Sequence, residues 1–94
     1  MSKYIQSDKF VLRKVATNIM LLPTDSESQN EHSGAIVINE IAEFIWSQLK
    51  EALSMDEIVG KLLDTYDIDK ETAEKDVEAL LNMFTEYDIV NAIE

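Results

Sequence analysis

An apolar segment that passes directly into a helical pattern, AIVINEIAEFIWSQL at residues 35–49, constrains the fold of this chain more than any other feature. Its first part, Ala35–Ile38, is made of small or β-branched residues without polar alternation, which is typical of a short strand. Asn39 is a good helix N-cap, and the carboxylates of Glu40 and Glu43 suit the positive end of a helix. The apolar residues at helical spacing are Ile41, Ile45 and Leu49. The segment therefore predicts a strand joined to a helix without an intervening loop.

The low content of turn-forming residues favours helices with short connections. The 94 residues include two Gly and one Pro, the residues that most often mark turns. A chain of this length holds one hydrophobic core, so we expect residues 1–94 to form a single domain. The absence of cysteine excludes a disulfide framework and a thiolate nucleophile. The start, MSKYIQSDKF, lacks the apolar run of a signal peptide, and no segment approaches the ~20 apolar residues of a membrane span. We therefore expect a cytoplasmic protein.

The charge balance narrows the class of partner. Nineteen acidic residues stand against eight basic ones, a formal net charge of −11. Nucleic-acid binding draws much of its affinity from Lys and Arg that neutralise phosphates, and anionic membranes attract the same residues. The composition therefore disfavours nucleic-acid and membrane partners and favours a peptide or protein partner with some basic character.

Two further strands are predicted within FVLRKVATNIMLL, residues 10–22. We place their turn near Thr17 and Asn18, because Asn tolerates the positive φ that such turns often need. Pro23 is expected to end the second strand, since it has no N–H to donate. Residues 24–34, TDSESQNEHSG, are polar and acidic and are interpreted as an exposed loop. The C-terminal DIVNAIE is compatible with either a short strand or an extended tail.

Two more helices follow the first. The second begins with a capping box formed by Ser54 and Glu57, and Asp69 caps the third. The apolar stripe of the second helix consists of Ile58, Val59, Leu62, Leu63 and Tyr66, and that of the third consists of Ala73, Val77, Leu80, Leu81 and Phe84. The order of elements predicts a winged-helix-like α+β fold, in which a small three-stranded antiparallel sheet is followed by three helices.

No pattern of residues indicates catalysis, a metal or a cofactor. Asp67–Glu78 places carboxylates at several positions of a calcium loop, but Thr72 stands where the sharp turn needs Gly, and the apolar periodicity predicts a helix there. Asp25 and Ser26 resemble the attachment site of an acyl carrier protein, but the residues after them supply no apolar helix face. His32 is the only histidine, so metal binding and nucleophilic catalysis lack a second group. We expect that the protein is not an enzyme.

The third helix carries a second stripe, rotated from its core stripe but sharing one residue with it. The second stripe consists of Asp76, Leu80, Met83 and Tyr87. A helix with two apolar-leaning stripes either has a wide buried face or leaves one face for a partner. The stripe alone leaves both interpretations open.

Four segments together resemble the coenzyme PQQ synthesis protein D (PqqD) family, whose fold is also called the RiPP precursor-recognition element. The segments are SDKFVLRKV (Ser7–Val15), AIVINEIAEFIWSQL with Asn39-Glu40 and Trp46, SMDEIVGKLLDTYDID (Ser54–Asp69) and EKDVEALLNMF (Glu74–Phe84). They span nearly the whole chain and are fairly specific in combination. The sequence departs from the family pattern in its long acidic loop at 24–34 and in its net charge, which bears on the precursor that is bound.

The resemblance implies a small non-catalytic chaperone that binds the leader of a ribosomally made, modified precursor peptide. Such a domain presents the precursor to a modifying enzyme, often a radical-SAM protein. The resemblance also implies that the leader adds as a strand along the third strand, in a groove walled by the third helix. On this chain the strand template is Ala35, Ile36, Val37 and Ile38, and the candidate groove residues, chosen by helical periodicity, are Asp76, Leu80 and Met83.

The physics of an edge strand supports the same site. An edge exposes unpaired N–H and C=O groups, and Ala35–Ile38 lacks the Lys, Pro or inward charge that usually guards such an edge. The main alternative is a winged-helix DNA-binding domain, which requires a basic recognition helix. Glu71–Glu86 contains one base, Lys75, among five acids. An adaptor that binds a folded protein without any peptide is a third possibility.

Overall fold

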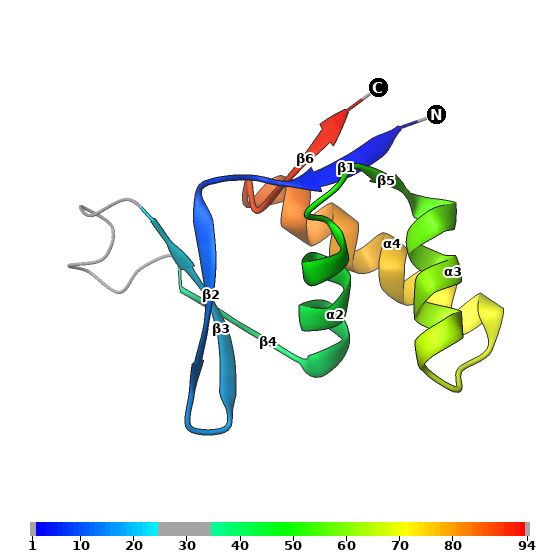
Figure 1. Ribbon diagram of the computed structural model, residues 1–94, viewed down its shortest axis with the longest axis horizontal. Coiled ribbons are helices and arrows are strands. Elements are labelled where there is room, and N and C mark those ends of the chain that lie inside the picture. Colours follow the sequence, from blue (N-terminus) through cyan, green and yellow to red (C-terminus); the bar gives the residue numbers. More distant parts are fainter. Residues whose placement is uncertain (1, 25–34, 94) are drawn as a thin grey trace.

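The computed structural model describes residues 2–24 and 35–93 of the chain. Within these ranges it contains two three-stranded sheets and three helices (Figure 1). The strands are β1 (Lys3–Gln6), β2 (Phe10–Val15), β3 (Asn18–Pro23), β4 (Ile36–Ile38), β5 (Leu53–Ser54) and β6 (Val90–Ile93), and the helices are α2 (Glu40–Gln48), α3 (Met55–Thr65) and α4 (Lys70–Glu86). The three predicted helices and three predicted strands are therefore all present.

The first sheet has the strand order β2-β3-β4 and is antiparallel. In the β2–β3 hairpin Val15 pairs with Asn18, which leaves Ala16 and Thr17 as the turn. The predicted turn lay one residue later, and the positive φ of 56° falls on Ala16, not on Asn18. The prediction relied on the tolerance of Asn for that conformation, whereas the cross-strand register decides which residue adopts it. Pro23 ends β3, as predicted.

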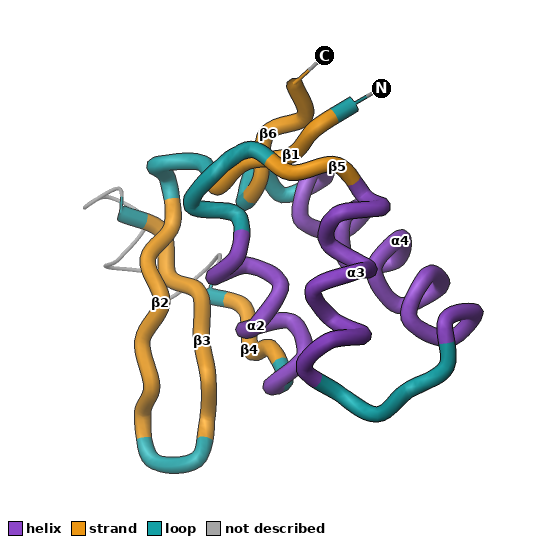
Figure 2. Tube along the Cα trace, turned by 45° about the vertical axis from the view of Figure 1, so that its right-hand side comes forward, coloured by secondary structure: helices purple, strands orange, loops and turns teal. Residues whose placement is uncertain are grey.

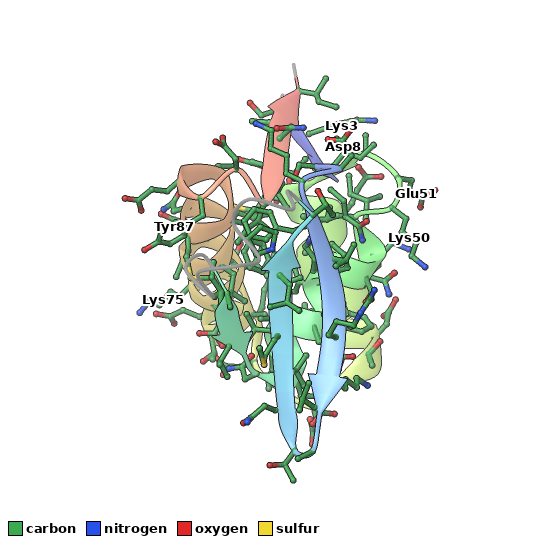
Figure 3. All side chains as sticks on the ribbon, turned by 90° about the vertical axis from the view of Figure 1, so that its left-hand side faces the viewer. Lys3, Asp8, Lys50, Glu51, Lys75 and Tyr87 are labelled. Atoms are coloured by element: carbon green, nitrogen blue, oxygen red, sulfur yellow. The ribbon has the colours of Figure 1, made fainter. Side chains whose placement is uncertain are left out.

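One face of this sheet packs toward the helices. Figure 3 looks at the sheet from outside and shows the helices behind it. On the inner face Leu21 of β3 and Ile38 of β4 are buried. Lys14 of β2 also belongs to this face, and its Nζ lies 2.9 Å from a carboxylate oxygen of Glu43 on α2. The inner face of the sheet thus contributes to the hydrophobic core, and the Lys14–Glu43 ion pair links the hairpin to α2.

The second sheet was not predicted as a sheet. Its order is β5-β1-β6, and it brings the two ends of the chain side by side (Figure 1). Lys3 pairs with Ile93 in β6 and with Ser54 in β5. No strand was predicted for residues 3–6 or 53–54, and the C-terminal segment was compatible with either a strand or a tail. These strands have two to four residues each, too few for a periodic pattern to be recognised.

The helices begin at the predicted caps. The side chains of Asn39, Ser54 and Asp69 each accept a hydrogen bond from the backbone N–H three residues later. The capping box of α3 is complete. Because α4 is helical from Lys70 onward, the segment at 67–78 is not a calcium loop.

The helices and both sheets share one hydrophobic core. Its buried residues are Leu21, Ile38, Ala42, Ile45, Trp46, Leu49, Leu53, Ile58, Val59, Leu62, Ala73, Val77, Leu81, Phe84, Ile89 and Val90. Most residues of the predicted stripes belong to this set. Leu80, which the two stripes of α4 share, is only partly buried at its edge. In the described ranges 2–24 and 35–93, no helix has both the length and the apolar character needed to cross a bilayer.

Candidate functional site

β4 is the outermost strand of its sheet. It pairs with β3 through Ile38 opposite Ile19 and Ile36 opposite Leu21, and its other edge pairs with no strand of the described residues. The C-terminal strand β6 pairs with β1 in the other sheet, so it does not cover this edge. Val37, between the two inward-facing isoleucines, is 67% exposed. Within the part of the chain that the structure describes, β4 therefore has an outer edge without a partner strand, whose backbone donors and acceptors can pair with an added strand.

A pocket of about 200 Å³ lies where β4 passes into α2. It is lined by Asn39, Ile41, Asp76, Ala79 and Leu80. The first two residues come from the N-terminal cap and first turn of α2, and the other three come from the middle of α4. Figure 3 places β4 and α4 on the same side of the molecule, and the labelled Lys75 of α4 and Tyr87, the C-cap of this helix, lie on that side as well. We call this cavity the edge pocket.

The predicted site residues fall into three groups. Asp76 and Leu80 meet in the edge pocket. Met83 lies about one helical turn beyond Leu80, is half-buried, and does not line the pocket. Ile36, Val37 and Ile38 form β4, whereas Ala35 precedes the strand. The structure thus brings two of the three helix residues to the end of the predicted strand.

Three pocket residues were not predicted as site residues. Asn39 was interpreted as a helix cap and Ile41 as part of a core stripe, and both roles are compatible with lining the pocket. Ile41 is only partly buried and packs at the edge of the core. Ala79 precedes Leu80 and is exposed. Helical periodicity could have selected Ala79, because it lies three residues after Asp76, but the meeting of α2 with α4 depends on tertiary packing.

The electrostatic character of the site is acidic. In residues 2–24 and 35–93 the carboxylate of Asp76 has no ion pair or hydrogen bond. Glu40, beside Asn39 in sequence, accepts a hydrogen bond from the hydroxyl of Tyr66 at 3.4 Å. Desolvation of that hydroxyl and the nearby charge of Glu40 raise the pKa of Tyr66. The pocket itself contains no basic side chain.

The same acidity argues against DNA binding. The bases of α4 are Lys70 and Lys75, and the Nζ of Lys75 lies 3.4 Å from the carboxylate of Glu71. The same helix contains five acidic residues, so α4 would repel the DNA phosphates and would not bind in a DNA groove as a recognition helix does. The winged-helix DNA-binding alternative is therefore not favoured.

The part of the chain that the structure describes offers no cluster of three or more His, Cys, Asp or Glu side chains that could hold a metal ion. Prosthetic-group attachment at Asp25 and Ser26 and metal binding at His32 were disfavoured by the sequence, and these residues lie outside the described ranges.

Comparison with known proteins identifies the family and a similar fold. The chain matches the family model described as coenzyme PQQ synthesis protein D (PqqD) over residues 18–90. The fold is similar to that of a solved structure described as TbiB1 in complex with the TbiA(beta) leader peptide, with a TM-score of 0.70 and 22% sequence identity. That match covers 93% of this chain and 94% of TbiB1. No curated protein matches the sequence. Since the family model spans most of its length, the chain belongs to the PqqD family.

Proposed function

We propose that this protein binds the leader of a ribosomally synthesised precursor peptide as an added strand along the free edge of β4. The observation that carries the proposal is the position of β4, which is the terminal strand of its sheet and ends at the edge pocket. A guest strand there would gain main-chain hydrogen bonds from β4 and side-chain contacts from α4.

Strand addition suits a leader peptide for a physical reason. Main-chain hydrogen bonds are largely independent of sequence and supply affinity, whereas pockets for alternate side chains supply selectivity. Side chains on one face of the guest would enter the edge pocket near Leu80. Met83, half-buried further along α4, would contact the next residue on that face. In this arrangement one part of the wide apolar face of α4 packs in the core and the adjoining part contacts the guest peptide.

Two comparisons support the proposal. The chain belongs to a family described by its part in coenzyme PQQ synthesis, and the similarly folded TbiB1 was solved with a leader peptide. We infer that the present chain acts in the same general way, as a non-catalytic chaperone. Its second partner would be the modifying enzyme, which we propose to be a radical-SAM protein. We place this exchange in the cytoplasm, where ribosomally made precursors are available.

Backbone methylation of the guest tests strand addition without changing the protein. The ligand is a synthetic leader peptide labelled for fluorescence anisotropy, taken from a candidate precursor that a search of the neighbouring genes would supply. In an added strand, alternate guest N–H groups donate to β4 and the intervening ones face away. We therefore expect N-methylation at alternate positions to weaken binding about tenfold or more, and N-methylation at the intervening positions to have little effect.

The pattern of the effect separates strand addition from other modes. An adaptor that recognises only the folded modifying enzyme would not bind the isolated leader. A leader that binds as a helix would lose affinity wherever a methyl group interrupts the helix, without alternation. Either result would contradict the proposal.

A further inference from the structure

We propose that the edge pocket selects guest strands with a defined charge pattern, namely one basic side chain and two apolar side chains at alternate positions. The basic side chain lies at the end of the guest that is beside Asn39. This inference rests on the strand addition proposed above and specifies which peptides that site accepts.

The chemistry of the pocket provides the first argument. Of its five lining residues, Asp76 is the ionisable one, and it stands beside the apolar side chains of Ile41 and Leu80. Asp76 is exposed and has no ion pair within residues 2–24 and 35–93. A guest side chain with a long apolar stem and a positive end would cover the apolar wall and place its charge at this carboxylate.

The spacing of side chains provides the second argument. β4 and α4 run in roughly opposite directions in both Figure 1 and Figure 2. Asp76 and Leu80 are separated by about 6 Å along a helix that rises 1.5 Å per residue. Alternate residues of a strand are separated by about 6.6 Å. A guest that places a basic residue at Asp76 therefore places its next inward residue at Leu80.

The pattern continues along the helix. The following inward residue of the guest comes about 6.6 Å further. The half-buried Met83 is the nearest apolar residue of this stripe, about 4.5 Å beyond Leu80 along the helix axis. Leu80 and Met83 both pack against the edge of the core, so these two guest positions are apolar. In a guest antiparallel to β4 the basic residue would be N-terminal to the two apolar residues. In a guest parallel to β4 it would be C-terminal to them.

Long-range attraction between a basic peptide and the net charge of −11 could produce a similar preference without any local contact. The two causes can be separated on α4 itself. Glu78 is an exposed carboxylate two residues from Asp76, on a different side of the helix. Neutralising either residue changes the net charge equally, but only Asp76 lines the pocket.

The test uses fluorescein-labelled peptides with a Gly/Ser host sequence and a central Lys-Thr-Val-Thr-Val or Gln-Thr-Val-Thr-Val, together with both reversed sequences. Binding is measured by anisotropy and located by amide chemical shifts. In one of the two directions we expect the Lys peptide to bind roughly two- to fivefold tighter than its Gln counterpart, as for a partly exposed ion pair. Asp76→Asn should abolish the preference for the Lys peptide, so that both peptides bind equally well. Glu78→Gln should keep most of that preference. High salt should reduce the preference.

The outcomes distinguish this inference from the proposed function. The charge pattern would be overturned if both variants lost the preference for the Lys peptide equally, or if the unmodified protein bound the Lys and Gln peptides equally well. Chemical-shift changes at the β4 amides would still support strand addition in either case. If none of the four peptides shifts any β4 amide at about 1 mM, strand addition itself is contradicted and the charge pattern with it.

Discussion

The side-chain oxygen of Asn39 accepts a hydrogen bond from the backbone N–H of Ala42 at 2.8 Å. Asn39 follows the last residue of β4 and precedes the first residue of α2, so this one contact joins the strand to the helix without a loop. Asn39 also lines the edge pocket. The junction therefore sets where β4 ends and α2 begins, at the edge pocket that α4 also lines.

Replacing this cap should weaken the junction. Asn39→Ala leaves the N–H of Ala42 without its partner, and we expect the free energy of unfolding to fall by about 1 kcal/mol. Asn39→Ser is the matched control, because Ser caps helices about as well as Asn. Urea unfolding followed by circular dichroism measures both. Equal stability of Asn39→Ala and the unmodified protein would mean that the cap contributes nothing.

Leu80 should separate binding from folding. It is half-buried and lines the edge pocket, so Leu80→Glu places a charge where the guest side chain would pack. We expect leader affinity to fall about tenfold or more, at a cost of about 1–2 kcal/mol in stability. Leu63→Glu is the matched control, since Leu63 is also half-buried at the edge of the core but lies on α3. If Leu80→Glu unfolds the domain, Leu80 is a core residue only.

The capping box of α3 should make stability depend on acid pH. The backbone N–H of Ser54 donates to Glu57 Oε1 at 2.9 Å, and hydrogen bonds from Ser54 hold the pKa of Glu57 below its ordinary value of 4.5. Because the folded pKa is the lower one, this stabilisation is present above pH 4.5 and is lost as the pH falls through the folded value.

Glu57→Gln should therefore make the unfolding free energy less dependent on pH between about pH 5 and pH 3. The control is Glu78→Gln, which removes an exposed carboxylate without a hydrogen bond or ion pair among the described residues. An identical pH dependence in the two variants would show that Glu57 does not contribute in this way.

The end of α4 offers a stabilising substitution. Asp88 has a φ of 61°, and the N–H of Ile89 donates to the carbonyl of Phe84 at 2.8 Å, which is the pattern of a Schellman C-cap. Glycine adopts that conformation without the steric cost that a side chain carries. We expect Asp88→Gly to raise the unfolding free energy by about 0.5–1 kcal/mol. Asp88→Ala, the control, should give no gain, and a gain as large as that of Gly would contradict the argument.

The helices could be predicted because their signals are local. The side chains of Asn39, Ser54 and Asp69 each cap a helix through a contact three residues away. The second sheet could not be predicted in the same way, because Lys3 pairs with Ile93 at the other end of the chain. Short strands of this kind are specified by their partners and not by their own pattern.

Part of the candidate site was predictable because helical periodicity is also a local signal. Helical periodicity placed Asp76 and Leu80 on one stripe of α4, and both line the edge pocket. Periodicity could not show that Asn39 and Ile41 form the opposite wall, because that depends on how α2 packs beside α4. Periodicity also could not show that the outer edge of β4 lacks a partner strand, because this depends on the strand order. The C-terminal strand β6 belongs to the other sheet and does not pair with β4.

Amide hydrogen exchange of β4 gives the most direct test of the central claim. Each strand residue directs its N–H to one side, so in the free protein the β4 amides that do not bond to β3 should exchange quickly. On addition of the leader peptide, those amides should become protected, together with chemical-shift changes at Leu80 and Met83. Unchanged exchange at β4, with protection confined to the β2–β3 hairpin or to α3, would contradict the claim that this edge receives the guest strand.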